Sequence, residues 1–379
     1  MKAAGQIFVT GMLRSGTSLL QTVLTNHPEV FVVYQPFHQL YVDVKAYFLQ
    51  TKGIERPLPL GDGTDGAVNE DKQFFDWLRE TRFDRGQAER LIRRSVIGKG
   101  GSCRTLSEEL PVISGTFHEL LECLYGALAR HFGRSSAHWL GSKEVLCEEY
   151  IPYLIRRQTR CLLIVRDPRA VIASANSGRY RDIVGDCYPT LMLARIWRKS
   201  VAYALSLGAS PHVQVVRYED LTQSTAQTLD TISRFLDVTP FATDALKGPL
   251  LDHAGAPWLG NSSFGDKKAI DAQSTSAWSA HLPDSMIDLI EALCYPEMLA
   301  LGYEPQLAPG ACAHVIETAQ EDTQSMRASY LNDYSLNDIE RGRELARWGA
   351  ILAAKTSDCS HGLNVLDGVQ SKLIAAMHA

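Results

Sequence analysis

A glycine-rich segment directly after a short apolar run places the strongest limit on what this chain can fold into. Residues 7–9 are apolar enough to form a buried strand, and residues 17–26 have the apolar spacing of a helix that ends before Pro28. The segment between them reads Gly11-Met-Leu-Arg-Ser-Gly-Thr-Ser18. Glycines let such a loop wrap tightly, so that successive N–H groups and the positive end of the helix face an anion. The sequence therefore predicts a phosphate-binding loop between a strand and a helix.

The residues of this loop also argue against one kind of anion, a nucleoside triphosphate with magnesium. Its glycine spacing and final hydroxyl match G-x-x-x-x-G-K-[ST], but Thr17 stands where that pattern has lysine. Arg14 supplies a cation inside the loop instead. The other polar or flexible positions are Ser15, Gly16 and Ser18. Because a nucleoside triphosphate with magnesium loses a main partner when the lysine is absent, we expect a different activated anion. A P-loop kinase or NTPase stays as an alternative.

Two more strand and helix units follow the first one. Residues 161–165 and 213–216 are predicted strands, and helices are predicted from residue 170 onward and up to about residue 236. Strands that alternate with helices imply an α/β fold, a P-loop-like parallel sheet covered by helices on both faces. The loops after the strands then lie along one edge of the sheet, where ligands collect.

Two regions lack this alternation of strands and helices. Residues from about 47 to 110 contain two glycine-rich stretches, and we interpret them as a mainly helical insertion that could form a lid or an acceptor region. Residues 306–379 follow a linker with proline and glycine and are predicted to form a C-terminal helical extension, in which Ser335-x-x-Asp338 could cap a helix. Residues 1–305 would then form the main domain.

A second candidate phosphate contact follows the strand at 161–165. Arg166-Asp-Pro-Arg169 places a guanidinium at the end of that strand, and Ser174 lies about two turns into the next helix. An arginine fork with a serine donor suits a terminal phosphate. Arg166 could instead pair with Asp167 or with a helix end.

Together the two loops resemble those of a known family. Gly11-Met-Leu-Arg-Ser-Gly-Thr-Ser-Leu-Leu20 is similar to the 5′-phosphosulfate loop of the PAPS-dependent sulfotransferases, in particular the branch with the tyrosylprotein and carbohydrate 6-O-sulfotransferases. Residues 166–174 resemble that family's 3′-phosphate loop, R-D-P-R-x-x-x-x-S. The resemblance covers about residues 7–45 and 140–303. It implies PAPS (3′-phosphoadenosine-5′-phosphosulfate) as cofactor, no metal, and transfer of the sulfuryl group to a hydroxyl or similar nucleophile.

The resemblance also implies which residues contact the nucleotide. The first loop would hold the 5′-phosphosulfate through Arg14, Ser15, Gly16, Thr17 and Ser18. Arg166 and Ser174 would hold the 3′-phosphate. Further nucleotide contacts are expected from Arg179, from Tyr218 in the segment Arg217-Tyr-Glu-Asp-Leu221, and from Lys268.

The catalytic residues are also expected from the resemblance. Arg14 and Lys143 would stabilise charge on the leaving oxygen, because Lys143 matches an active-site lysine of the tyrosylprotein branch. The carbohydrate branch has its base, a glutamate, where this chain has Gln35, and a carboxamide cannot take a proton at neutral pH. Three explanations stay open. His38 or Glu144 could be the base, the acceptor could be a phenol or amine that needs less help, or Gln35 could be an engineered substitution.

Composition limits the partners. The net charge is −5, with 38 basic and 43 acidic residues, which argues against a nucleic-acid binder. The eight cysteines are scattered singly and form no metal-binding pattern. No stretch approaches the roughly 20 apolar residues that span a bilayer, so we expect no membrane span and a cytoplasmic location.

No motif identifies the acceptor. We expect a small-molecule or carrier-bound acceptor, and the helical tail could build a homodimer. A non-catalytic nucleotide-binding protein is a second alternative to a sulfotransferase.

Overall fold

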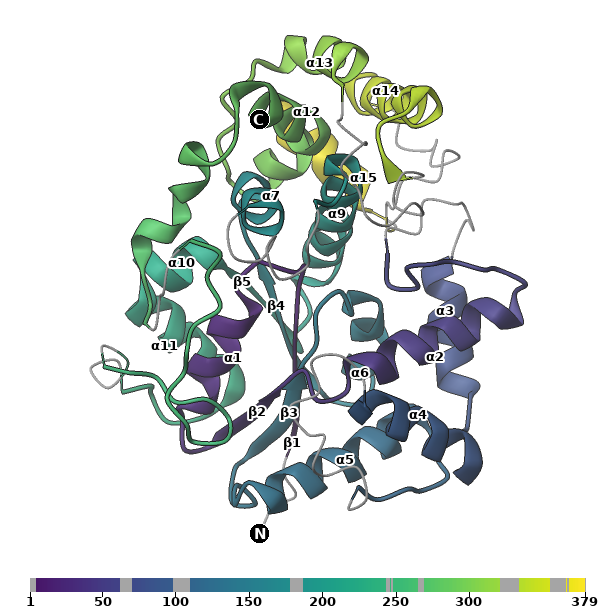
Figure 1. Cartoon of the computed structure of the whole chain (residues 1–379), viewed down its shortest axis with the longest axis vertical. Coiled ribbons are helices and arrows are strands. Elements are labelled where there is room, and N and C mark those ends of the chain that lie inside the picture. Colours follow the sequence, from purple (N-terminus) through teal and green to yellow (C-terminus); the bar gives the residue numbers. More distant parts are fainter. Residues whose placement is uncertain are drawn as a thin grey trace.

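Five parallel strands form one sheet at the centre of the protein (Figure 1). The computed structural model describes residues 5–61, 70–97, 110–177, 187–242, 246, 248–264, 269–320, 334–354, 366 and 368–378. The strands are β1 (Gly5–Thr10), β2 (Val30–Tyr34), β3 (Trp139–Lys143), β4 (Arg160–Val165) and β5 (Val213–Arg217). Their order across the sheet is β2-β3-β1-β4-β5, and all neighbours are parallel. The predicted parallel α/β sheet is confirmed.

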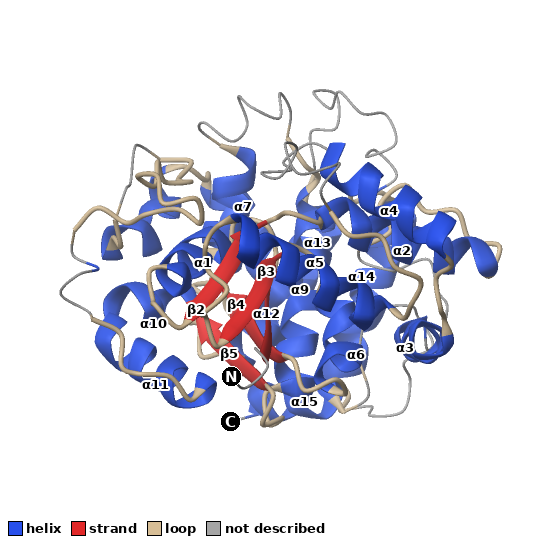
Figure 2. Ribbon diagram, turned by 90° about the horizontal axis from the view of Figure 1, so that it is seen from below, coloured by secondary structure: helices blue, strands red, loops and turns tan. Residues whose placement is uncertain are grey.

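Helices surround this sheet on both sides (Figure 2). They are α1 (Thr17–Thr25), α2 (His38–Thr51), α3 (Glu70–Glu80), α4 (Arg85–Ile97), α5 (Phe117–His131), α6 (Ile151–Ile155), α7 (Pro168–Asn176), α9 (Thr190–Leu207), α10 (Tyr218–Gln223), α11 (Thr225–Leu236), α12 (Asp284–Ala300), α13 (Cys312–Thr318), α14 (Asp338–Leu352) and α15 (Val369–His378). Short 3₁₀ turns lie at Glu148–Tyr150, Ala272–Thr275, Ala277–Ala280 and Pro309–Ala311.

Alternating residues of β1 supply the core on the two faces of the sheet. Ile7 and Val9 pack with residues of α1, α10 and α11, whereas Phe8 packs with residues of α2, α5 and α6. Successive side chains of a strand point to opposite faces, and here both faces are buried. Because helices cover both faces, a ligand reaches the sheet through the loops at its strand ends.

Two strands, β2 and β3, are missing from the sequence prediction. β2 is a run of β-branched and aromatic residues, Val-Phe-Val-Val-Tyr, so its strand signal is readable. β3, Trp-Leu-Gly-Ser-Lys, gives little such signal because it contains a glycine and a lysine. Gly141 is needed in β3, since a Cβ there would overlap the backbone oxygen of Ile7 on β1. The glycine that weakens the local signal is thus required by a close approach between strands.

The described part of the predicted insertion is helical and belongs to the main core. Phe48, Phe74 and Phe83 are buried in the same cluster as Phe8 of β1. Lys45 of α2 is also buried, and its Nζ lies 2.8 Å from Oε1 of Glu70 at the start of α3. The insertion is therefore held against the sheet by aromatic packing and a buried ion pair. Its role as a lid or acceptor region stays a prediction.

The predicted C-terminal extension contains α13, α14 and α15, which pack against α12, α9 and each other. Glu344 of α14 is buried between Arg195 and Arg198 of α9, with N···O distances of 2.8 and 2.6 Å. These pairs join the extension to the main domain. The predicted cap at Ser335 is wrong, because the side chain of Asn337 accepts the hydrogen bond from the Glu340 N–H and α14 begins one residue later.

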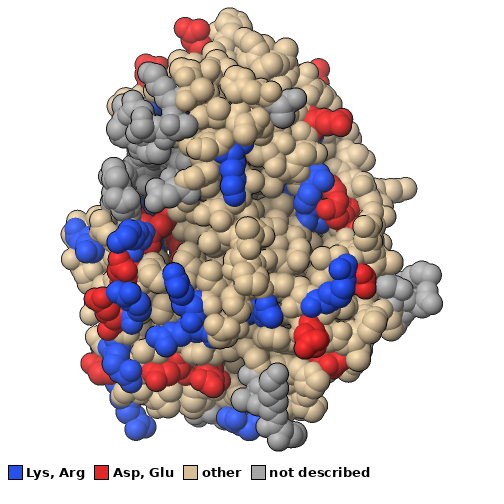
Figure 3. Space-filling view, turned by 180° about the vertical axis from the view of Figure 1, so that it is seen from behind, with Lys and Arg blue, Asp and Glu red and all other residues tan. Residues whose placement is uncertain are grey.

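The surface carries charges of both signs. On the face opposite to that of Figure 1, Lys and Arg are interspersed with Asp and Glu (Figure 3). Pairs of this kind occur on the insertion, where Lys72 lies 3.2 Å from Asp76 and Arg93 lies 2.8 Å from Glu89. Among the described residues, no helix combines the length and the apolar character needed to cross a membrane.

Candidate active site

The loop after β1 has the tight form that its glycines predict. Gly11 and Gly16 have φ angles of +150° and +96°. A Cβ at Gly11 would overlap the Ile164 oxygen, and one at Gly16 would overlap the ring of Tyr218. Gly16 is the N-cap of α1 and gives no side-chain cap, so the first N–H groups of this helix point out of its end without a capping side chain. This end of α1 is suited to an anion.

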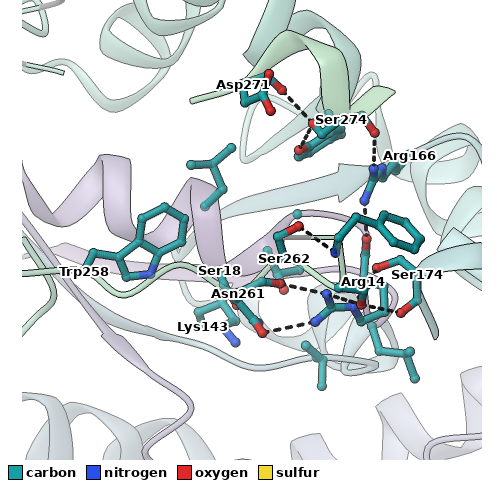
Figure 4. Close-up of a pocket in the computed structure, with 18 of the residues that line it drawn as sticks. Arg14, Ser18, Lys143, Arg166, Ser174, Trp258, Asn261, Ser262, Asp271 and Ser274 are labelled. Carbon is teal, nitrogen blue, oxygen red and sulfur yellow. Dashed lines mark hydrogen bonds between the residues drawn. The ribbon is translucent and has the colours of Figure 1, made fainter. Parts of the chain in front are cut away.

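A pocket lies at the carboxyl ends of the strands, with this loop as its floor (Figure 4). Every strand contributes lining residues from its end or from the loop after it: Leu13, Arg14, Gly16, Thr17 and Ser18 after β1, Tyr34 and Gln35 at β2, Lys143 and Val145 at β3, Arg166 at β4, and Tyr218 after β5. Ser174 of α7 and residues between 258 and 277 complete the lining. The pocket thus has the position expected for ligand binding in a parallel α/β sheet.

Arg14 lies where the two predicted phosphate loops meet. Its Nε donates to Oγ of Ser174 over 3.0 Å, and its NH2 donates to Oγ of Ser263 over 2.9 Å. Its guanidinium also donates to the side-chain and backbone oxygens of Asn261, as Figure 4 shows. The backbone of Arg14 has a φ of +65°, a conformation that is costly for a residue with a Cβ. Arg14 therefore joins the first loop to the second loop and to the segment around Asn261.

Arg166 stands at the end of β4, above the ring of Tyr218. Its Cζ lies 4.2 Å from the centroid of that ring. Its NH1 and NH2 donate to the backbone oxygens of Arg14 and Ser274 over 3.1 and 2.7 Å. The Tyr218 hydroxyl lies 2.5 Å from Oγ of Ser274, which fixes the ring. In the part of the chain that the structure describes, stacking and backbone acceptors hold the guanidinium in place without a carboxylate.

Lys143 ends β3 with a buried ammonium group that faces the pocket. Its Nζ donates to Oε1 of Gln35 over 2.9 Å and lies 3.7 Å from the centroid of the Tyr34 ring. Burial lowers the pKa of Lys143 to about 7; the Arg14 charge lowers it as well, whereas Glu144 opposes the decrease. The Gln35 N–H donates to the Lys143 carbonyl over 2.9 Å, which continues the β2–β3 ladder to this point.

Glu144 and His38 lie close to each other, and neither lines the pocket. Oε2 of Glu144 lies 4.0 Å from Nδ1 of His38, and its Oε1 accepts a hydrogen bond from the Phe37 N–H. Burial raises the pKa of Glu144 to about 8. Burial and the Lys143 charge lower the pKa of His38 to about 4. At neutral pH these shifts favour the protonated carboxyl group of Glu144 and the neutral imidazole of His38.

The cations of the pocket differ from the other buried cations. Lys143 and Arg166 have no carboxylate oxygen within 4.0 Å in the described part of the chain. The remaining buried Lys and Arg side chains there each have one: Lys45, Arg169, Arg195, Arg198, Lys199 and Arg347. A buried charge without a counter-ion is costly, so a protein normally pairs it. The exceptions lie in this pocket, which is therefore suited to an anion.

Most of the predicted site residues converge on this pocket. Arg14, Gly16, Thr17, Ser18, Gln35, Lys143, Arg166, Ser174 and Tyr218 line it. Ser15 does not, because its hydroxyl donates to the Met12 carbonyl inside the loop over 2.6 Å. Arg179 and Lys268 lie outside the described residues.

The sequence prediction misses the wall formed by residues 258–264 and 269–277. Trp258, Asn261 and Ser263 of this wall line the pocket, as do Asp271 and Ser274. The available signal was a stretch rich in Asn and Ser between two aromatic residues. Nothing in residues 258–264 indicates which strand ends they lie over.

Comparisons with known proteins show which sequences and structures this chain is similar to. The model of a family described as the sulfotransferase family matches residues 6–243. Carbohydrate sulfotransferase 5 of Homo sapiens is 24% identical over 343 residues, which cover 79% of this chain and 77% of that protein. Carbohydrate sulfotransferase 1 of Rattus norvegicus is 23% identical over 340 residues, which cover 79% of each protein. Among solved structures, the sulfotransferase domain from the curacin biosynthetic pathway aligns with 80% of this chain and 99% of that domain, at 20% identity and a TM-score of 0.45.

Proposed function

The chain belongs to the sulfotransferase family, and we propose that it moves a sulfuryl group from PAPS to a hydroxyl or similar nucleophile of an acceptor. The observation that carries the choice of donor is the pair of buried cations, Lys143 and Arg166, which have only neutral hydrogen-bond acceptors among the described residues. A nucleotide with phosphate groups at two positions would supply the missing negative charge.

The described residues fit such a donor in further respects. The glycine loop leaves no room for a Cβ at Gly11 or Gly16, and α1 begins at this loop without a side-chain cap. Nε of Arg166 is buried and has no hydrogen-bond partner within the described ranges of the chain. Arg14 and the loop would hold the 5′-phosphosulfate, and Arg166 with Ser174 would hold the 3′-phosphate. Arg14 and Ser174 already contact each other, so both phosphate sites would share one hydrogen-bond network.

Lys143 and Arg14 would provide the main catalytic effect. When bound, PAPS supplies an activated sulfuryl group, and its transfer leaves 3′-phosphoadenosine-5′-phosphate (PAP). The two cations stabilise the negative charge that develops on the leaving oxygen. Gln35 and the Tyr34 ring hold the Lys143 ammonium in place beforehand, so little reorganisation is needed during the reaction.

For the acceptor's proton we propose His38 rather than Glu144. Burial raises the pKa of Glu144 to about 8, which favours its protonated form at neutral pH and makes it a poorer base there. The lowered pKa of His38 keeps its imidazole neutral, with a lone pair on one ring nitrogen. The His38 side chain is 28% exposed, whereas that of Glu144 is fully buried. Neither group lines the pocket, and between the two the protonation state favours His38.

The identity of the acceptor is a separate proposal. A small-molecule or carrier-bound acceptor, a homodimer through the C-terminal helices and a cytoplasmic location all stay predictions from the sequence. They do not affect the donor chemistry proposed above.

The test is an assay for PAP formation from PAPS with a panel of acceptors that contains phenols, amines, sugars and acyl chains on a carrier protein. Acceptor-dependent PAP formation with a matching sulfated product is the expected result. Phosphate transfer from ATP with magnesium, and none from PAPS, would contradict the proposal. PAP binding without turnover on any acceptor, unchanged in Gln35→Glu, would favour a non-catalytic protein.

A further inference from the structure

A short turn far along the chain contacts both the guanidinium of Arg166 and the ring on which it stacks. This 3₁₀ turn, Ala272–Thr275, lies in the pocket wall that the sequence prediction misses. The backbone oxygen of Ser274 accepts a hydrogen bond from NH2 of Arg166 over 2.7 Å, and its Oγ lies 2.5 Å from the Tyr218 hydroxyl. All three residues are buried. Ser274 therefore contacts Arg166 through its backbone and the stacking partner of Arg166 through its side chain.

The two hydroxyl groups have one consistent arrangement of protons. Oγ of Ser274 lies 2.6 Å from the backbone oxygen of Asp271, which can only accept. Figure 4 shows Ser274 between Asp271 and Arg166. A hydroxyl has one proton to donate and two lone pairs that accept. Ser274 therefore donates to Asp271 and accepts from Tyr218, and this chain of hydrogen bonds fixes the ring of Tyr218.

The contacts of Arg166 determine the plane of its guanidinium. NH2 donates to the backbone oxygen of Ser274, and NH1 donates to the backbone oxygen of Arg14 over 3.1 Å. The ring of Tyr218 covers the guanidinium, with 4.2 Å between Cζ and the ring centroid. Nε is buried and, as far as the structure describes the chain, has no hydrogen-bond partner. Two acceptors and one ring therefore hold the guanidinium in one orientation, with a donor left for an anion.

We propose that Ser274 is a positioning residue that orients Arg166 toward the 3′-phosphate of the donor. It acts through its backbone oxygen and through the Tyr218 hydroxyl, which keeps the ring against the guanidinium. This inference rests on the proposed function, because it assigns Arg166 to a 3′-phosphate. A purely structural role, in which Ser274 only holds its turn against α10, predicts a different mutational pattern.

Two substitutions remove the same hydrogen bond from its two ends. Tyr218→Phe removes the hydroxyl and keeps the ring that stacks on Arg166. Ser274→Ala removes Oγ and keeps the backbone oxygen that accepts from Arg166. If the bond between the two hydroxyls positions Arg166, each variant loses selectivity for the 3′-phosphate. The double variant then loses no more than either single variant, because the same contact is absent in all three.

The experiment is calorimetric titration of the full chain with PAP and with adenosine 5′-phosphate, which lacks the 3′-phosphate. We expect each single variant to weaken PAP binding about 3- to 10-fold, as for the loss of one hydrogen bond. Binding of adenosine 5′-phosphate should change less than about twofold. Adding Ser274→Ala to Arg166→Ala should weaken PAP binding by less than about twofold more, because Ser274 acts through Arg166.

Thr275→Ala is the matched control in the same turn. Oγ1 of Thr275 donates to a backbone oxygen of the turn and accepts from Nε2 of Gln223 in α10 over 3.1 Å. It ties the turn to α10 as Ser274 does, but none of its side-chain hydrogen bonds to described residues reaches Arg166 or Tyr218. We expect Thr275→Ala to keep the selectivity for PAP. Equal losses of selectivity in Thr275→Ala and Ser274→Ala would show a structural role and overturn the inference.

The outcomes separate this inference from the proposed function. An unchanged protein that binds PAP no more tightly than adenosine 5′-phosphate would contradict both. If the unchanged protein prefers PAP, unaltered PAP binding in both single variants, or an equal loss for both nucleotides, would overturn the role of Ser274 alone. The same loss from Ser274→Ala with and without Arg166 would overturn it too. Thermal unfolding within a few degrees of the unchanged protein would show that the variants fold, and Tyr218→Phe tests the same bond if Ser274→Ala does not fold.

Discussion

The Lys143 ammonium donates a hydrogen bond to Oε1 of Gln35 over 2.9 Å, at the point where β2 and β3 end side by side. The carboxamide orients the ammonium without neutralising it. The glutamine that replaces the expected base thus has a role of its own: it holds a buried cation whose pKa is close to neutral. Several consequences of this arrangement can be measured.

The pH dependence should reveal the protonation of Lys143. Burial lowers its pKa to about 7, with Arg14 acting in the same direction and Glu144 and Cys147 against it. In the proposed mechanism the charged form stabilises the leaving oxygen, so kcat/KM should fall as pH rises through about 7. Because kcat/KM reports the free enzyme, its profile is the one to measure. A value that stays constant between pH 6 and about 9 would contradict this role for Lys143.

Gln35→Glu should move that pH limit upward. A carboxylate beside the ammonium favours its charged form, so the decrease in kcat/KM should begin about 1 to 3 pH units higher. Turnover should also increase if position 35 faces the acceptor, because a carboxylate can take its proton. Gln87→Glu is the control, since Oε1 of Gln87 accepts from the Asp84 N–H in a surface cap that glutamate can also form. An unchanged pH profile would mean that Gln35 does not influence Lys143 in solution.

Arg166→Ala should remove selectivity for the 3′-phosphate. PAP binding should weaken about 10- to 100-fold, whereas binding of adenosine 5′-phosphate should change less than about threefold, because a charge-assisted contact is lost only for the former. Calorimetry with the two nucleotides measures this difference. Arg234→Ala on the surface of α11 is the control, since its side chain is 71% exposed. Equal losses for both nucleotides would refute the assignment of Arg166.

Gly16→Ala should destabilise the protein and disrupt the phosphate loop. Its φ of +96° is unfavourable for alanine, and the new Cβ would overlap the Tyr218 ring. We expect a loss of about 1–3 kcal/mol in the free energy of unfolding, together with weaker PAP binding. Gly349→Ala, in the interior of α14 with open space around it, should instead leave the stability unchanged or raise it by up to about 1 kcal/mol. Thermal melts of both variants test this difference, and equal effects would contradict it.

The sequence was sufficient for those parts of the site that follow directly after a strand. The glycine spacing around Arg14 and the Arg166-to-Ser174 spacing are local patterns, and these three residues line one pocket. The orientation of Glu144 could not be predicted in this way. Successive residues at the end of a strand point to opposite sides, so Lys143 faces the pocket and Glu144 faces the core. Because β3 was not predicted, the opposite orientations of Lys143 and Glu144 were not predicted either.

Asn261 could not be found from a local pattern either. It lies 247 residues after Arg14 along the chain, in a stretch without a helix or strand. Its place over the loop depends on contacts with Arg14, Ser18 and the neighbourhood of Ser174, which come from two different strand ends. Such a contact becomes visible only when the sheet order is known.

A sulfotransferase that uses PAPS must bind, at these two loops, a nucleotide with phosphates at the 3′ and 5′ positions. Calorimetric titration with PAP and with ADP, each without and with magnesium, tests it most directly. The arrangement of Arg14, Lys143 and Arg166 predicts tighter binding of PAP, by about tenfold or more, with no dependence on magnesium. Tighter binding of ADP that requires magnesium would contradict the claim and favour a kinase or NTPase instead.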